Sequence, residues 1–416
     1  MKLCCIEKVD GVDYRATMLN LEVTAMDNKV RIFLVWGLGV ILFASQAFAE
    51  GEQWLRYNYA RDADETARVA YSLRMSGDRP AGVELPEFKD PKPMFTVWKS
   101  PMAKGGQVHI AFDSDGKPGA YNLLYVDSDC DGNLREETPY KPFRIDTNYG
   151  NYGPVKILLD GDDGPVAYHL NFMHQKYNTS EVYLSVMSVC WYEGMITIGT
   201  EKKLCVLTDA TNNGQFNDTS KEYYSADRIV LGEGPKAVTT IVGKFLQVEG
   251  KLYRLEVAKD GAYVKILPAD DAVLGRVKVP PEINELVATG ENGLFKVSPK
   301  EGLDSIPQGL YRIHRWVIDK TDEKANKWRM EGQAFRESGD FEIKKEGTAF
   351  LAVGEPVTSK LEVKTKRGKY AFNHSLTGQM GERVSIMKNN QRMPAPKLRV
   401  VSEDKIFDRS YSFEYG

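Results

Sequence analysis

The sequence predicts a mainly β, multi-domain protein, in which antiparallel β domains follow a short N-terminal helix and a β-sandwich ends the chain. A length of 416 residues exceeds what one hydrophobic core normally organises and indicates two or three domains. Aromatic residues make up 11% of the chain, with 21 tyrosines, which favours strands over a helical bundle. From about residue 105 onward, short runs of Val, Ile, Leu and Tyr alternate with Gly, Asp and Asn clusters, the pattern of strands joined by turns.

The first element is an export signal. Ile32–Ala49 reads IFLVWGLGVILFASQAFA; two basic residues precede it and an Ala-x-Ala sequence ends it. These are the charged, apolar and cleavage regions of a signal peptide, so we expect residues 1–49 to be removed and the mature chain to be secreted or periplasmic. Residues 1–25 are polar and are interpreted as an upstream extension, with Met18 or Met26 as the true start.

An uncleaved membrane anchor is the alternative interpretation of Ile32–Ala49, because eighteen apolar-leaning residues just span a bilayer. The Ala-x-Ala ending and the polar residues after it favour cleavage. Since no second apolar run of that length follows, we expect no membrane span in the mature chain.

Residues 50–100 are expected to form a helix and an extended linker. Asp62–Met75 has apolar residues at helical spacing and acidic residues early in the segment, where the helix dipole favours them. The four prolines of the segment that follows predict extended chain up to about residue 95.

Three strand-rich regions follow: a β domain over 101–235, a smaller β unit over 236–297 and a terminal region over 298–416. The terminal strands, such as KLEVKTKRG, KYAFNHSL and SYSFEY, recur at the spacing of a sandwich. This pattern resembles the immunoglobulin-like or fibronectin-like β-sandwiches appended to bacterial surface proteins, although no Cys–Trp–Cys spacing is present.

An acidic loop, DSDCDGNLREE, carries the sharpest chemical signal. Asp127, Asp129 and Asp131 alternate and are followed by Gly132-Asn133-Leu134. Calcium takes six to eight oxygen ligands, and alternate acids in a tight loop turn toward one point. The loop resembles the calcium loops of EF-hands, dockerins and thrombospondin-type repeats, but it departs from the EF-hand at its end, so that Glu137, or else Glu136, would be the last ligand. Asn133 would offer its backbone carbonyl, and Leu134 would anchor the loop.

A second loop, LTDATNNGQFND, fits the same template with fewer charges. Asp209 aligns with Asp127, Asn213 with Asp131 and Asp218 with Glu136, which predicts a degenerate internal repeat and a weaker calcium site. The paired loops resemble those of uncharacterised secreted bacterial β-rich proteins, which have no established activity to carry over.

The alternative for both loops is a solvated turn that binds no metal, its Asp and Asn side chains capping their own backbone. Two other acidic turns, Asp113–Gly116 and Asp160–Gly164, have less of the pattern and are interpreted as turns.

Catalytic signatures are weak. Five histidines form no H-E-x-x-H motif, and the chain has no G-x-S-x-G elbow or phosphate loop. The net charge of −3 gives no basic excess for nucleic acid. Three cysteines lie beyond the signal, Cys130, Cys190 and Cys205, and an odd number means at least one unpaired thiol or a pairing between chains. Cys190 and Cys205 are expected either as a cross-strand disulfide or as buried free thiols.

The sequence therefore favours an exported, non-catalytic scaffold or binding protein that calcium stabilises and that contacts a protein or polysaccharide of the cell envelope. The alternatives are a secreted hydrolase acting on carbohydrate and a structural β module that binds no metal.

Overall fold

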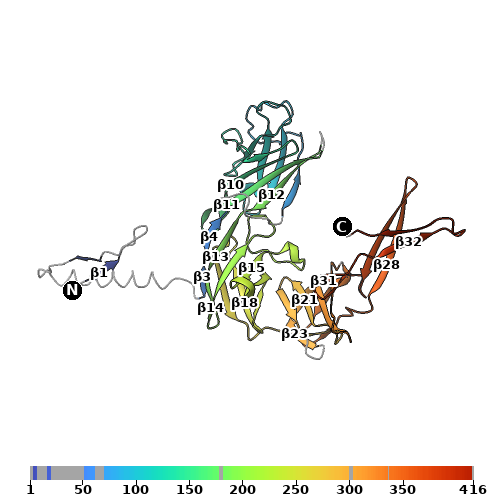
Figure 1. Cartoon of the computed structure of the whole chain (residues 1–416). Helices are drawn as coiled ribbons and strands as arrows, with labels where there is room; N and C mark the ends of the chain where they lie inside the picture. The colour runs from blue at the N-terminus through green and yellow to red at the C-terminus, as the bar shows by residue number, and fades with distance from the viewer. Residues whose placement is uncertain are drawn as a thin grey trace. The chain divides into compact units, whose positions relative to one another are not determined.

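A computed structural model describes residues 3–6, 16–19, 51–60, 70–177, 181–298, 303–335 and 337–414 (Figure 1). The chain divides into two compact units, Met1–Glu52 and Gln53–Gly416. The described residues of the first unit pair as β1 (Leu3–Ile6) and β2 (Ala16–Leu19). The expected signal sequence, Ile32–Ala49, lies outside the described residues. Within the described part of the chain, no helix is long and apolar enough to cross a membrane.

Four sheets fill the first part of the second unit. One has the order β5 (Tyr71–Arg74), β12 (Val182–Ser188), β11 (Gly164–Lys176), β10 (Tyr149–Gly161), β9 (Arg144–Ile145). The next has the order β16 (Val238–Ile241), β15 (Arg228–Leu231), β14 (Glu201–Thr208), β13 (Cys190–Ile198), β4 (Arg56–Tyr59). A three-stranded sheet contains β6 (Met94–Lys99), β7 (Gln107–Asp113) and β8 (Leu123–Val126). The fourth contains β17 (Phe245–Val248), β18 (Lys251–Val257), β19 (Tyr263–Pro268) and β3 (Glu52–Trp54).

The rest of the unit contains three more sheets. One pairs β23 (Leu303–Pro307), β20 (Leu274–Lys278) and β27 (Thr348–Phe350). A nine-stranded sheet has the order β22 (Gly293–Val297), β21 (Glu285–Gly290), β24 (Gly309–Thr321), β25 (Lys327–Gln333), β30 (Arg383–Lys388), β29 (Lys369–Thr377), β28 (Thr358–Lys366). Two further strands complete the nine: β26 (Asp340–Ile343) pairs with β24, and β31 (Gln391–Arg392) pairs with β30. A last ribbon pairs β32 (Lys397–Val401) with β33 (Asp408–Ser412).

The expectation of a mainly β, antiparallel protein is confirmed. The described strand pairs are antiparallel except for β20 with β27. The helical turns among the described residues are short 3-10 turns at Lys104–Gly106, Tyr223–Ser225, Gly234–Lys236 and Glu337–Gly339. Strands before and after residue 298 share sheets, since β20 pairs with β23 and β21 with β24.

The expected N-terminal helix over Asp62–Met75 is wrong in its described part. Tyr71–Arg74 is strand β5, which pairs with β12, and residues 61–69 lie outside the described residues. The tail of the segment also has the alternation of a strand, because Leu73 and Met75 are more buried than Ser72 and Arg74. Tyr71–Arg74 therefore forms a strand because it pairs with β12, although the spacing of the apolar residues in the segment suits a helix.

Two large cores hold the sheets. The first runs from Leu55 to Val264 and includes fully buried Trp98, Tyr168 and Phe216. The second runs from Val277 to Val384 around Trp316. Cys130, Cys190 and Cys205 are buried and form no disulfide among the described residues, which for Cys190 and Cys205 agrees with the second of the two sequence alternatives.

Two histidines in the first core predict a loss of stability in acid. His169 and His174 on β11 are buried, and burial lowers the pKa of each imidazole to about 4. The unfolded chain takes up these protons near pH 6.5, whereas the folded chain stays neutral down to about pH 4. Each histidine therefore stabilises the fold fully above pH 6.5, and up to roughly 3 kcal/mol is lost as the pH falls to 4.

NMR titration of the imidazole Cε1 protons checks this expectation. The two resonances should titrate near pH 4 in the folded protein, and denaturant unfolding should become easier from pH 6.5 down to 4.5. An ordinary midpoint near pH 6.5 for either imidazole would contradict the burial argument.

Candidate metal centre

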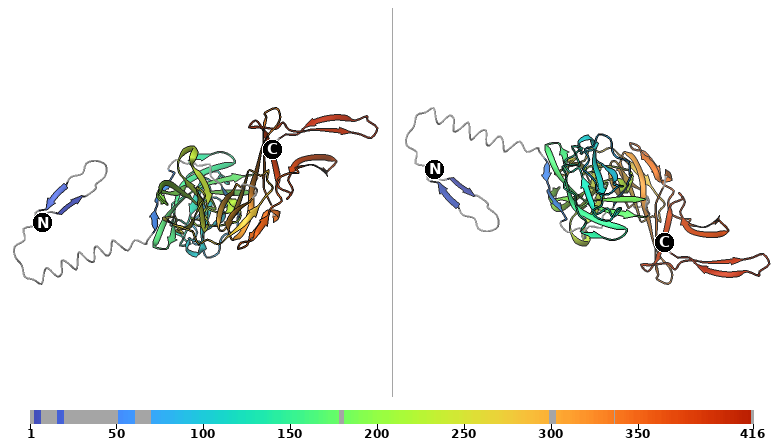
Figure 2. Two further views of the ribbon diagram at one scale, coloured as in Figure 1. Left: turned by 90° about the horizontal axis from the view of Figure 1, so that it is seen from below. Right: turned by 90° about the horizontal axis from the view of Figure 1, so that it is seen from above.

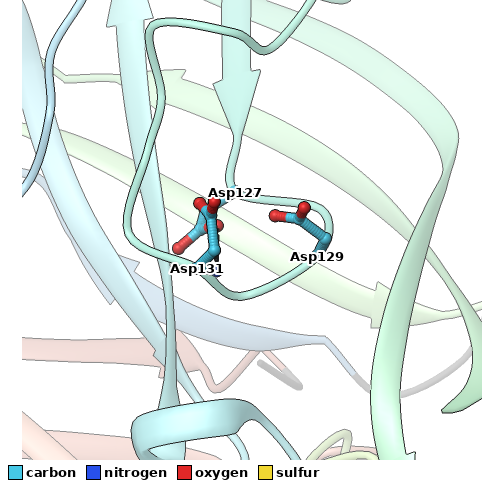
Figure 3. A group of neighbouring side chains, drawn as sticks. All are labelled: Asp127, Asp129 and Asp131. Carbon is cyan, nitrogen blue, oxygen red and sulfur yellow. Dashed lines mark hydrogen bonds between the residues drawn. The ribbon is translucent and has the colours of Figure 1, made fainter.

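The loop after β8 brings three carboxylates together. Asp127 follows the last residue of β8 and is buried, whereas Asp129 and Asp131 are exposed. One carboxylate oxygen from each lies within 4.8 Å of the other two. Figure 3 shows the three side chains turned toward the inside of the loop. Among the described residues, this acidic cluster is the group of three or more His, Cys, Asp or Glu side chains that could hold a metal ion.

Backbone hydrogen bonds give the loop its shape. The Asp127 carboxylate accepts the backbone N–H groups of Asp131 (3.0 Å) and Gly132 (3.1 Å), and Asp131 accepts that of Asn133 at 2.7 Å. Cys130 and Gly132 have φ angles of 60° and 83°, which let the chain reverse. Each carboxylate has about four acceptor positions, so these bonds leave acceptor capacity for a cation.

Leu134 anchors the loop as the sequence predicted. Its N–H donates to the Glu84 carbonyl at 2.8 Å, and the Glu84 N–H donates to the Gly132 carbonyl at 3.0 Å. The Leu134 side chain is fully buried and packs with Phe95 and Ala111. The extended segment around Glu84 thus fixes the second half of the loop.

The loop carries excess negative charge. Burial raises the pKa of Asp127, against the hydrogen bonds from Gly132 and Asp131, and burial also raises that of Glu137. The pKa of Glu136 is raised mainly by the nearby charge of Asp131. Because nearby carboxylates repel one another, a bound cation would relieve the repulsion.

The last expected ligand has a different contact. Glu137 accepts the Ser128 N–H at 2.5 Å and is not part of the three-aspartate group. This hydrogen bond joins Glu137, at the C-terminal end of the loop, to Ser128 at its N-terminal end. Glu137 and the Asn133 carbonyl as ligands stay predictions.

The second loop repeats part of the backbone geometry of the first. Asp209, directly after β14, accepts the N–H group of Gly214 at 2.7 Å, as Asp127 accepts that of Gly132. Its other backbone donor is Asn212 at 2.6 Å, which aligns with Cys130, whereas Asp127 accepts the N–H of Asp131. The Asn213 side chain accepts the Gln215 N–H, as Asp131 accepts that of Asn133. Phe216 is buried, and its N–H pairs with the Lys259 carbonyl, as Leu134 pairs with Glu84.

The carboxylates of the second loop accept more hydrogen bonds from side chains of the protein than those of the first loop do. The Tyr168 hydroxyl donates to Asp209 at 2.6 Å, and the Thr211 hydroxyl and Asn213 amide donate to Asp218 at 2.7 and 2.6 Å. These contacts favour the alternative of a self-capped turn. Calcium at Asp209, Asn213 and Asp218 stays a prediction.

Sequence reasoning missed Asp227. Its carboxylate accepts the N–H groups of Ala210 (2.9 Å) and Asp218 (2.8 Å), and it is fully buried. Ala210 aligns with Ser128 of the first loop, whose N–H donates to Glu137. Asp227 therefore accepts the equivalent backbone N–H in the second loop. Burial raises the pKa of Asp227, with Asp209 adding to the shift. Asp227 directly precedes strand β15, nine residues after Asp218, so no spacing within the loop reveals it.

Comparison of the chain with protein-family models, with curated proteins and with solved structures finds no match.

Proposed function

We propose that the chain is an exported, non-catalytic scaffold or binding protein of the cell envelope or exterior, and that calcium stabilises it at the Asp127 loop. The convergence of the Asp127, Asp129 and Asp131 carboxylates within 4.8 Å supports the metal. Export rests on the Ile32–Ala49 sequence alone. An immunoglobulin-like character for 298–416 belongs to the same proposal, supported by the antiparallel strands there.

The chemistry of the donors favours calcium over softer metals. The three side chains offer oxygen only, which suits a hard cation. Cys130 lies in the same loop, but its thiol donates to the Leu158 carbonyl at 3.5 Å and is not one of the three groups that converge. Exposed Asp129 and Asp131 leave room for the water ligands that calcium commonly keeps.

A weak site suits such a protein. Extracellular calcium modules bind at roughly 10⁻⁴–10⁻³ M, and calcium in excess of that range stabilises the folded state alone. The two alternatives from the sequence, a secreted hydrolase acting on carbohydrate and a structural β module that binds no metal, stay hypotheses.

Thermal unfolding in calcium and in chelator tests the proposal. Calcium at about ten times its Kd should add about 1.4 kcal/mol and raise the midpoint by a few degrees. The double substitution Asp129→Asn with Asp131→Asn should abolish the rise, because it removes two charges while an amide oxygen can still accept the Asn133 N–H.

The matched control is Asp162→Asn with Asp163→Asn in the exposed turn between β10 and β11, which should keep the calcium response. A wild-type midpoint that calcium does not move, or an equal rise in the Asp129/Asp131 variant, would contradict the proposal.

A further inference from the structure

The C-terminal end of the chain carries two narrow β ribbons (red in Figures 1 and 2). The arm ribbon consists of β28 and β29, which pair over nine residues, whereas β29 joins β30 through a single pair, Thr377 with Arg383. The tail ribbon consists of β32 and β33, which form a sheet of their own.

Alternation gives the arm ribbon two different faces. Val363 is paired with Phe372 and Thr365 with Tyr370, so these side chains share one face. Lys360 and Lys364 lie on the opposite face. The apolar face stays largely open, since Tyr370 is 68% exposed.

The two ribbons line an aromatic groove of about 760 Å³. Side chains from both contribute, among them Tyr370, Phe372, Leu398, Phe407, Tyr411 and Phe413. The rings of Tyr370 and Phe372 lie 6.5 Å apart at 30°, which makes a row of ring faces along one strand. Flat apolar rings in a row suit a ligand with repeated flat apolar faces.

The segment that forms the two ribbons carries an excess of positive charge. Residues 357–414 contain twelve lysines and arginines against six aspartates and glutamates, a formal charge of +6 in a chain whose total is −3. Of the six acids, Glu362 pairs with Lys360, Asp408 pairs with Arg399, and Glu382 is buried. Lys364, Lys369 and Lys397 are exposed, and no ion pair among the described residues engages them.

We propose that the two ribbons bind an anionic polysaccharide, with sugar rings stacked on the aromatic side chains of the groove and the acidic groups paired with the lysines and arginines around it. This excess of positive charge suits a polymer with a repeating negative charge. The inference rests on the proposed function, because export would bring the chain to such a polymer.

The charges disfavour two other occupants. Two arm ribbons from separate copies would repel each other. The turn between β32 and β33 carries Glu403 and Asp404 against one lysine, Lys405, beside Ile406, which opposes insertion of this turn into an anionic membrane.

Measuring the binding of the protein to polygalacturonate tests this inference. The measurement is made in chelator, so that no calcium binds at the Asp127 loop. Neutral dextran, poly-glutamate and vesicles of anionic phospholipid serve as comparison probes. Wild-type protein should bind polygalacturonate best, and salt should weaken the binding. The pair Tyr370→Ala and Tyr411→Ala should weaken it roughly tenfold or more without changing any charge. Lys369→Gln, which removes a positive charge from the lining of the groove, should also weaken it.

Tyr177→Ala is the matched control, because Tyr177 is 69% exposed but lies outside the ribbons, and its binding should equal wild type. Failure to bind polygalacturonate, equal binding of poly-glutamate or vesicles, or full binding by the double tyrosine variant would overturn the inference. So would a dimer in sedimentation that the ribbon substitutions dissociate. If one of these results were obtained while calcium still raised the midpoint of thermal unfolding, the polysaccharide inference would fail and the calcium proposal would stand.

Discussion

Replacing Trp98 with alanine is expected to lower the free energy of unfolding by about 3–5 kcal/mol. Trp98 on β6 is fully buried in the first core, and its ring stacks on Tyr168 with centroids 5.6 Å apart. Its indole N–H donates to the Asn212 carbonyl at 2.7 Å, inside the second acidic loop. The substitution therefore opens a cavity and also leaves a buried carbonyl without its donor.

The effect should extend into the second loop, because Tyr168 also holds Asp209. Denaturant unfolding measures the loss of stability, and hydrogen exchange at the Gly214 amide, which donates to Asp209, reports the loosening of the loop. Trp54→Ala serves as control, since Trp54 is 54% exposed and its loss should cost less than about 1 kcal/mol. Equal stability of the two variants would contradict the account of the first core.

The second large effect is expected for Trp316→Ala, again about 3–5 kcal/mol. Trp316 on β24 is fully buried, and its indole N–H donates to the buried Glu382 at 2.7 Å. Glu382 also accepts the Met380 N–H, so it fastens the turn between β29 and β30 to the second core. Removing the indole leaves a buried carboxylate without one of its donors, which adds to the cost of the cavity.

Trp316→Phe separates the two contributions, because phenylalanine keeps most of the buried ring and removes only the donor. We expect it to cost less than alanine but at least about 1 kcal/mol. Denaturant unfolding measures both variants. Since β29 meets β30 through one residue pair, hydrogen exchange in the turn at Gly378–Glu382 should also rise. Unchanged exchange there would show that Glu382 does not hold the turn.

Local patterns of the sequence predicted the strands and the first loop well. The spacing of Asp127, Asp129 and Asp131 after an apolar strand suffices, because the loop forms most of its hydrogen bonds within itself. The anchoring by Leu134 was predictable as a role, but its partner Glu84 lies fifty residues away and depends on how the chain returns to the loop.

What the sequence failed to predict depends on contacts between distant segments. Asp227 joins the second loop because β15 pairs with β14. Tyr71–Arg74 becomes a strand because β12 offers an edge. The sequence pattern predicted strands at β28, β29 and β33, but only the pairing shows that the C-terminal strands form two ribbons with an open aromatic face.

Crystals soaked in about 10 mM calcium, above the roughly 10⁻⁴–10⁻³ M range of extracellular sites, test the central claim most directly. Anomalous difference density at a wavelength where calcium scatters should show a peak between the carboxylates of Asp127, Asp129 and Asp131, at oxygen distances of about 2.3–2.6 Å. Carboxylates without a peak between them, in a loop otherwise unchanged, would contradict a calcium site there and leave an acidic turn in its place.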